Sequence, residues 1–148
     1  MKEKYSNKEL CCLVHEKTFE NEEMYLKVIF LLEEDGIKPV HSNDIAKVLK
    51  ISLPSVVEML GKMEKKGLIK YDGRKGVFFK QKGKNTAKKI VRNLRLTELL
   101  LKDILEMKNY MECACKLEHV IKEEIAEAIK KKLKNPQKNP DGKPIPKV

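Results

Sequence analysis

Hydrophobic residues recur with helical spacing in the first third of the chain, where they predict two successive helices. Over residues 21–34, apolar residues are mixed with acidic ones and turn formers are absent, which indicates a mostly buried helix that ends at Asp35 and Gly36. Ser42 is a suitable N-cap for a shorter helix over residues 43–50, which has an apolar face of its own.

A further helix is predicted after a short break. Ser52 can cap this helix, Pro54 is tolerated in its first turn, and Gly67 ends it. Its apolar positions recur at helical spacing and should pack inward: Val56, Met59, Leu60 and Met63. The opposite side carries Ser52, Ser55, Glu58 and Lys62. The pattern therefore predicts helix, short turn and helix, with a polar face left exposed.

Two β-prone stretches follow, at residues 68–71 and 77–80. The segment between them is rich in turn formers and carries Arg74 and Lys75, so it predicts a hairpin with two cations at its tip. A helix-turn-helix followed by such a hairpin is the pattern of a winged helix.

The second half of the chain is patterned as two longer helices, one from Gly83 to about residue 106 and one over about residues 111–133. The first of them has a broad apolar face between Ile90 and Leu105. Two helices cannot hide this much apolar surface by themselves, so we expect it to be buried against an identical partner. Residues 135–148 contain four prolines and predict an irregular tail.

These elements predict a mainly α protein, a winged helix-turn-helix followed by a helical dimerisation domain. We expect an N-terminal extension at residues 1–20, a DNA-binding domain at 21–83, a helical domain at 84–134 and the Pro-rich tail at 135–148.

The net charge of +10 is concentrated in one segment. Residues 37–90 hold fourteen Lys or Arg and four Asp or Glu, and the remaining residues are balanced at eighteen of each sign. Charge alone leaves open a solvated lysine-rich surface, but its coincidence with the winged helix favours double-stranded DNA as the partner. The candidate DNA-binding residues are Ser42, Ser52, Pro54, Ser55, Glu58, Lys62, Arg74 and Lys75.

Composition argues against membrane and disulfide-rich classes. The longest purely apolar run, at residues 28–32, is too short for a bilayer span or a signal peptide, so we expect a cytoplasmic protein without a membrane partner. The cysteines form two close pairs, at positions 11 and 12 and at 113 and 115, which make a poor disulfide framework. Reduced thiols, some of them metal ligands, fit this spacing better.

Cys115, Glu118 and His119 stand at i, i+3 and i+4 on the second predicted C-terminal helix, so a thiolate, a carboxylate and an imidazole would share one face. Two other interpretations stay open. The three residues could be ordinary core and surface residues, or Cys115 and His119 could be a nucleophile and its base. No glycine-rich loop or oxyanion donor set accompanies the pair, so we do not expect an enzyme.

Several spaced motifs resemble the diphtheria-toxin-repressor family of metal-dependent regulators, and they extend over nearly the whole chain beyond residue 20. They are Glu23-Met24-Tyr25-Leu26, Asp44-Ile45-Ala46, Ser52-x-Pro54-Ser55-Val56, Met63-Glu64-Lys65-Lys66-Gly67-Leu68, Arg95-Leu96-x-Glu98, Cys115-x-x-Glu118-His119-Val120 and Asn139-x-x-Gly142-x-Pro144-Ile145-Pro146. The resemblance implies a homodimer that binds a divalent metal, usually ferrous iron or manganese, and represses metal-uptake genes from a palindromic operator. The family's SH3-like third domain has no counterpart here, so we expect a two-domain form.

The resemblance also implies a primary metal site made of Met24, Cys115, Glu118 and His119. The manganese-selective branch has an aspartate where this chain has Met24, and a thioether suits a softer ion, so iron(II) is expected ahead of manganese(II). Alternatively, Met24 is simply a core methionine.

The family's ancillary metal site needs two histidines and a glutamate, of which this chain keeps only Glu98. Leu94 and Met111 stand at the histidine positions. We therefore expect one sensing metal per subunit, or an ancillary site rebuilt from other residues. The family's usual recognition-helix glutamine is Glu58 here, which can accept a hydrogen bond from cytosine N4 but repels phosphates, so the operator sequence cannot be transferred from relatives.

Two questions stay open from the sequence. Cys11, Cys12 and His15 in the extension could form a separate metal or redox site, whereas His41 is expected in a loop without a special role. The main alternative function is a metal-independent dimeric winged-helix protein with a vestigial metal site.

Overall fold

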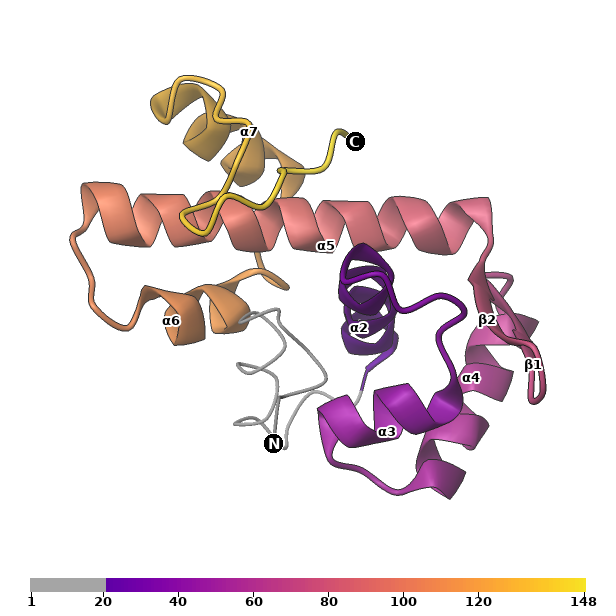
Figure 1. The fold of residues 1–148 in the computed structure, drawn as a ribbon. Helices are drawn as coiled ribbons and strands as arrows, with labels where there is room; N and C mark the ends of the chain where they lie inside the picture. Colours follow the sequence, from indigo (N-terminus) through magenta and orange to yellow (C-terminus); the bar gives the residue numbers. More distant parts are fainter. Residues whose placement is uncertain (1–20) are drawn as a thin grey trace. The chain divides into compact units, whose positions relative to one another are not determined.

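The computed structural model describes residues 21–148, which belong to two compact units (Figure 1). The first unit ends at Ala87 and the second begins at Lys88, so the boundary falls inside helix α5 (Gln81–Leu99). The described residues are mostly helical and form one two-stranded sheet, which confirms the predicted fold class. No helix in this part of the chain is both long and apolar enough to cross a bilayer.

Helix α2 (Glu22–Glu34) supplies much of the first unit's core. Its N-cap is Asn21, whose side-chain oxygen accepts a hydrogen bond from the backbone N–H of Met24 at 3.0 Å. Two glutamates lie in the first turn, where their negative charge interacts favourably with the positive end of the helix dipole. Eight of its thirteen residues are buried: Met24, Tyr25, Leu26, Lys27, Val28, Ile29, Leu31 and Leu32. This burial agrees with the nearly continuous apolar pattern of the segment.

Helices α3 (Ser42–Leu49) and α4 (Leu53–Lys65) form the predicted helix-turn-helix. The expected Ser42 cap is wrong by one residue. His41 is the N-cap, and its backbone N–H donates to Asp44 Oδ2 at 3.0 Å. Lys50 turns the chain in the left-handed conformation (φ 53°). Ser52 then caps α4, as predicted, by accepting a hydrogen bond from the Ser55 N–H at 3.3 Å.

The wing consists of strands β1 (Ile69–Asp72) and β2 (Gly76–Phe79), which pair antiparallel as the predicted hairpin. Val77 donates its N–H to the Val40 carbonyl at 2.8 Å, so the wing is fixed to the segment that precedes α3. Gly76 has a φ of 105°, and a Cβ there would lie 2.8 Å from the same Val40 oxygen. Only glycine fits this position.

Two apolar clusters pack on α5 in the second unit. The first contains Leu94, Leu101 and Ala114, with Met107, Tyr110, Cys113 and Cys115 against it. The second contains Leu96, Ala126 and Ile129, with Leu100, Ile121, Leu133 and Ile145 against it. Most of the apolar face between Ile90 and Leu105 is therefore buried within one chain, which corrects the expectation that a partner is needed to cover it.

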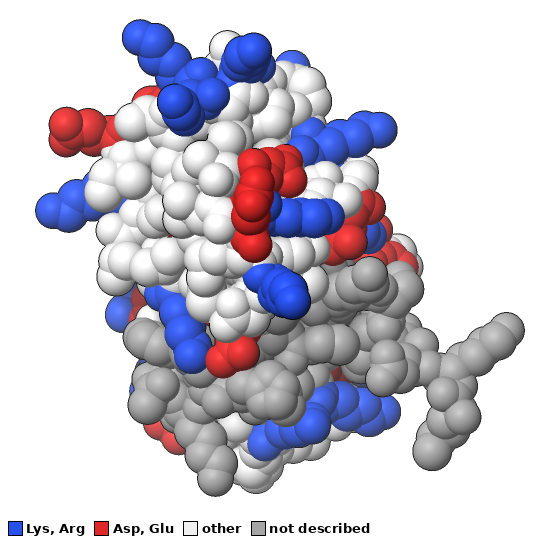
Figure 2. Space-filling view, turned by 90° about the vertical axis from the view of Figure 1, so that its left-hand side faces the viewer, with Lys and Arg blue, Asp and Glu red and all other residues white. Residues whose placement is uncertain are grey.

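Other large apolar side chains of the second unit remain exposed. They are Ile104 and Leu105, where α5 ends through a π-helical turn (η2, Leu100–Ile104), together with Leu117, Val120, Ile125 and Val148. Figure 2 views the molecule from the side at which α5 ends, and uncharged residues, drawn white, form a broad area there between charged groups.

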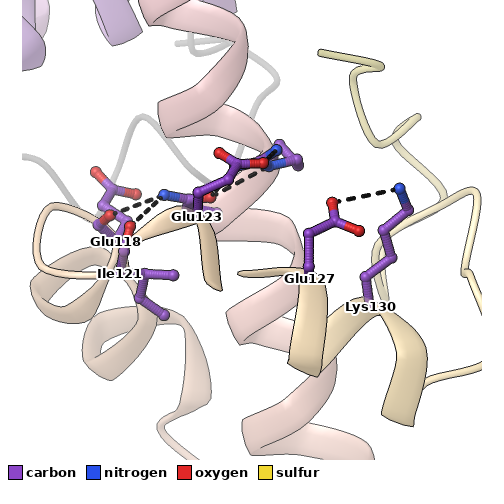
Figure 3. Close-up of polar contacts among 7 residues, drawn as sticks. Glu118, Ile121, Glu123, Glu127 and Lys130 are labelled. Atoms are coloured by element: carbon purple, nitrogen blue, oxygen red, sulfur yellow. Dashed lines mark hydrogen bonds and ion pairs between the residues drawn. The ribbon is translucent and has the colours of Figure 1, made fainter. Parts of the chain in front are cut away.

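The single helix predicted over residues 111–133 is wrong, because the structure has two helices, α6 (Tyr110–Leu117) and α7 (Glu123–Lys132). The Asn93 side chain on α5 donates to the carbonyl oxygens of Glu118 at 3.4 Å and Ile121 at 3.0 Å (Figure 3). A continuous helix would have used these oxygens in its own hydrogen bonds. The break is thus stabilised by a residue far away in the sequence.

The Pro-rich tail has no regular structure, as predicted, but it is docked on α5. Arg95 Nη1 on α5 donates to the Pro144 carbonyl at 2.5 Å, and Ile145 packs against the second apolar cluster. Lys138 and Pro144 form an isolated antiparallel bridge that closes the tail into a loop. The tail therefore packs against the second unit's core.

Candidate DNA-binding face and metal centre

Helix α4 separates a buried side from an exposed side, as its sequence predicted. Val56, Leu60 and Met63 are fully buried, whereas Met59 is only half-buried. On the other side, the predicted contact residues are all exposed: Ser52, Pro54, Ser55, Glu58 and Lys62. We call this set the α4 face. A helix with one side packed and the other carrying short polar groups has the form of a recognition helix.

Glu58 and Lys62 on the α4 face form an ion pair one helical turn apart, with 2.7 Å between Oε1 and Nζ. The hydrogen bond from Lys62, together with its charge, lowers the pKa of Glu58, so the carboxylate is ionised at neutral pH. Both side chains are exposed, and such a pair contributes little to stability. The Glu58 carboxylate is instead available to a ligand. An ionised carboxylate only accepts hydrogen bonds, and the N4 amino group of cytosine is a donor that it could bind.

Serines at the start of these helices differ in accessibility. The Oγ atoms of Ser52 and Ser55 lie 2.7 Å apart at the exposed N-terminus of α4. Ser42, the first residue of α3, is only half-buried, so its side chain keeps part of its surface. All three remain accessible to a ligand.

The wing tip presents Arg74 and Lys75, both exposed. Asp72 holds this turn, because its Oδ1 accepts hydrogen bonds from the N–H groups of Arg74 at 2.8 Å and Lys75 at 2.9 Å. The bond from Lys75 is the main cause, and that from Arg74 the second, of the lowered pKa of Asp72. A fixed backbone with two projecting cations suits contact with phosphates.

Other exposed residues near these elements escaped the sequence analysis. Leu53 and Val57 on α4 are 39% and 41% exposed, and apolar side chains in this setting can contact thymine methyl groups. Lys80, Lys82 and Lys84 are exposed where β2 leads into α5. Leu53 and Val57 are four residues apart and lie outside the buried stripe of α4, so the helical spacing indicates that both are exposed. The three lysines belong to the excess positive charge of residues 37–90.

Two of the predicted metal ligands come together in the second unit. Glu118 Oε1 and His119 Nε2 lie 3.1 Å apart, with side chains 0% and 8% exposed. The expectation that all three donors share one helix face is wrong at His119, because α6 ends at Leu117. Glu118 is its C-cap and His119 lies in the turn that follows. A carboxylate and an imidazole nevertheless meet in a buried setting.

The remaining predicted ligands, Cys115 and Met24, stand on other elements of the chain. Cys115 is half-buried and packs against the first apolar cluster. Among residues 21–148, no three His, Cys, Asp or Glu side chains form one group, so Cys115 does not join the Glu118–His119 pair. Met24 is 7% exposed in α2 of the first unit. Of the three donors predicted in the second unit, the structure thus brings Glu118 and His119 together.

The ancillary positions hold no histidine beside Glu98. Leu94 is fully buried in the first apolar cluster, and Met111 is half-buried on α6. Glu98 is 1% exposed, and its Oε2 accepts a hydrogen bond from Asn139 Nδ2 at 2.8 Å. Cys11, Cys12 and His15 lie outside the described residues.

Comparison with known proteins agrees with this division. Residues 17–77 match the family model described as "Iron dependent repressor, N-terminal DNA binding domain". Residues 80–147 match "Iron dependent repressor, metal binding and dimerisation domain". The α4 face and the wing tip fall within the first match, and the Glu118–His119 pair falls within the second.

Three proteins illustrate the similarity. The diphtheria toxin repressor of Corynebacterium glutamicum is 34% identical over 84% of this chain, which spans just over half (55%) of that protein. An uncharacterised helix-turn-helix regulator of Methanocaldococcus jannaschii is 33% identical over 71% of this chain and 86% of its own length. A solved manganese-dependent transcriptional repressor in complex with manganese is 29% identical with a TM-score of 0.78, over 85% of this chain and 58% of that one. The chain therefore belongs to the iron-dependent repressor family of metal-dependent transcriptional regulators.

Proposed function

We propose that this protein is a homodimeric, metal-responsive repressor that binds a palindromic operator of metal-homeostasis genes. The proposal rests on one observation: the same chain has an exposed, cationic winged helix in one unit and the buried Glu118–His119 donor pair in the other. A regulator of this kind acts on chromosomal DNA, so we place it in the cytoplasm.

The donor chemistry of the second unit fits a divalent transition metal. Glu118 and His119 offer a carboxylate and an imidazole with donor atoms 3.1 Å apart, and Cys115 adds a thiol on the same unit. We propose that these three residues and Met24 would hold the ion, as the family resemblance implies. Thiolate and thioether donors favour iron(II) over manganese(II). A bound ion would supply ligand bonds that order the residues contributing to it.

The proposed response depends on which unit each donor comes from. Met24 belongs to the DNA-binding unit and the other three donors to the second unit. Ligands drawn from both units would order each α4 face relative to the dimer axis. Two such faces must enter successive major grooves about one helical turn apart, so disorder between them costs binding free energy.

Dimerisation is supported by the apolar side chains that the second unit leaves exposed. Leu105 is 57% and Val120 is 66% exposed, and Ile104, Leu117 and Ile125 add to them. Several large apolar residues left exposed on one unit favour burial against another surface, and a second copy of the chain provides the same surface by symmetry.

Selection from a random duplex library tests the proposal. The protein is incubated anaerobically with the library and either iron(II) or a chelator, and bound duplexes are sequenced. We expect enrichment of a two-fold symmetric sequence only with iron(II). Equal enrichment with the chelator would instead support the metal-independent alternative, and no enrichment in either case would refute DNA recognition.

A further inference from the structure

The turn that carries Glu118 and His119 is held to α5 by a buried polar network. Asn93 is 7% exposed, and its Nδ2 donates to the carbonyl oxygens of Glu118 and Ile121, at 3.4 and 3.0 Å. These two oxygens lie on either side of His119 along the backbone. One amide group therefore fixes both ends of the segment that presents the donor pair.

Arg92 fixes the orientation of that amide. The Asn93 Oδ1 atom accepts hydrogen bonds from Arg92 Nε at 3.3 Å and Nη2 at 3.1 Å, which leaves the Nδ2 atom pointing toward the turn. Arg92 also donates to both carboxylate oxygens of Glu123, at 2.7 and 2.9 Å, in the forked geometry that guanidinium groups favour (Figure 3). The network thus continues onto the first turn of α7, directly after the break.

A turn of this kind would otherwise be a poor platform for ligands. It lies between two short helices, and outside the helices its backbone has few hydrogen bonds of its own, such as that from Val120 N–H to the Leu117 carbonyl at 3.0 Å. Ligands that are not held in place lose binding free energy when they are ordered. Partners that orient metal ligands typically change metal affinity about 10–100-fold when they are removed.

We propose that Asn93, oriented by Arg92, is a positioning residue for the metal donors Glu118 and His119. It acts through the backbone of the turn and does not bind the metal. The proposal rests on the proposed function, and it assigns a metal-related role to a residue that carries no ligand chemistry. It also explains why α6 and α7 are separated at the donor pair.

Cobalt(II) titration of the folded protein, followed by visible absorption, tests the proposal. Asn93→Asp keeps the size of the side chain and an oxygen toward Arg92 but loses the amide donors. We expect its cobalt dissociation constant to rise by at least about tenfold, with altered ligand-field bands at saturation. Glu127→Gln is the matched control, because it removes the exposed Glu127–Lys130 pair (3.5 Å) on α7 without touching the turn, and it should bind like wild type.

Three outcomes would overturn the proposal: wild-type affinity and spectrum in folded Asn93→Asp, an equal loss in Glu127→Gln, or rapid exchange of the turn's amide hydrogens in metal-free wild type. Slow exchange at Glu118 and Val120 is expected but is also explained by their backbone hydrogen bonds to Ala114 and Leu117. If Asn93→Asp does not fold, Arg92→Lys decides the matter, because it keeps the positive charge but loses the forked contacts that orient the Asn93 amide. We expect a similar loss of cobalt affinity in this variant, and wild-type affinity would overturn the proposal. Failure of wild type itself to bind cobalt would refute the proposed metal site rather than the role of Asn93.

Discussion

The side-chain amide of Asn139 donates a hydrogen bond to Glu98 Oε2 at 2.8 Å and so joins the tail to α5 at a buried position. The other end of the amide is used as well, because Asn139 Oδ1 accepts hydrogen bonds from the N–H groups of Asp141 at 3.1 Å and Lys143 at 2.8 Å. Glu98 stands at the glutamate position of the ancillary metal site that the family resemblance implies. In this chain its carboxylate anchors the tail.

Asn139→Ala should therefore destabilise the protein without changing its metal content. Loss of a buried hydrogen bond to a charged group lowers the free energy of unfolding by about 1–3 kcal/mol. Urea unfolding of the metal-free protein measures this loss, and metal analysis of the loaded protein should still give one ion per protomer. Unchanged stability with a loss of bound metal would contradict the anchoring role of Glu98.

Charge placed on the exposed apolar residues of the second unit should dissociate the dimer. Leu105→Asp puts a carboxylate on a side chain that is 57% exposed in one protomer but would be buried between two, at a cost of several kcal/mol. Sedimentation equilibrium should show a dimer for wild type and a monomer for Leu105→Asp. Phe78→Asp, at an exposed apolar residue (44%) of the first unit, is the control and should remain dimeric. A monomeric wild type at micromolar concentration would remove the basis of half-site recognition.

Substitutions in the wing and in the α4 face should have different effects on DNA binding. Arg74→Ala or Lys75→Ala should weaken binding to all sequences alike and reduce the slope of log affinity against log salt by about 0.9 per lost phosphate contact. Glu58→Ala should change the preferred base instead, since its carboxylate accepts hydrogen bonds from base edges. Binding assays against a randomised operator at several salt concentrations separate the two effects. A changed consensus in the wing variants, with an unchanged one in Glu58→Ala, would reverse the assignment.

The Arg92–Glu123 pair should make part of the stability dependent on pH. The hydrogen bond from Arg92 is the largest cause of the lowered pKa of Glu123, whose ordinary value is 4.5. When folding lowers the pKa of a carboxylate, the ionised group stabilises the folded state at every pH above its ordinary pKa. This contribution is lost as the pH falls below the ordinary pKa and through the lowered one. Wild type should therefore be more stable than Glu123→Gln at pH 7 and 5, and the difference should shrink below pH 4.5. Urea midpoints at pH 7, 5 and 3.5 measure this, and a difference that grows on acidification would show that the pair does not act in this way.

The DNA-binding unit could be predicted in detail because its determinants are local. The cap at Ser52, the apolar stripe of α4 and the turn formers of the wing all act within a few residues of their own element. The one-residue error at the start of α3 also has a local cause. The His41 N–H donates to the Asp44 carboxylate, and this makes His41 the N-cap although the sequence predicts a loop without a special role there.

The second unit was harder to predict because its decisive contacts are long-range. The break between α6 and α7 depends on Asn93, which is 25 residues before Glu118, and nothing in the local pattern of residues 111–133 indicates it. The same break moves His119 off the helix face that its spacing with Cys115 implied. The apolar face of α5 was assigned to a partner because the sequence does not show that α6, α7 and the tail cover most of it.

Operator affinity measured by fluorescence anisotropy tests the central claim of metal-controlled DNA binding most directly. Wild type and His119→Ala are each titrated into a labelled operator, once with a chelator and once with excess iron(II) or cobalt(II). We expect the metal to tighten binding by wild type at least about tenfold, which corresponds to roughly 1.4 kcal/mol of coupling, and His119→Ala to lose this gain while its circular dichroism and sedimentation stay unchanged. Equal affinity under all four conditions would contradict metal control and leave a DNA-binding protein that does not respond to metal.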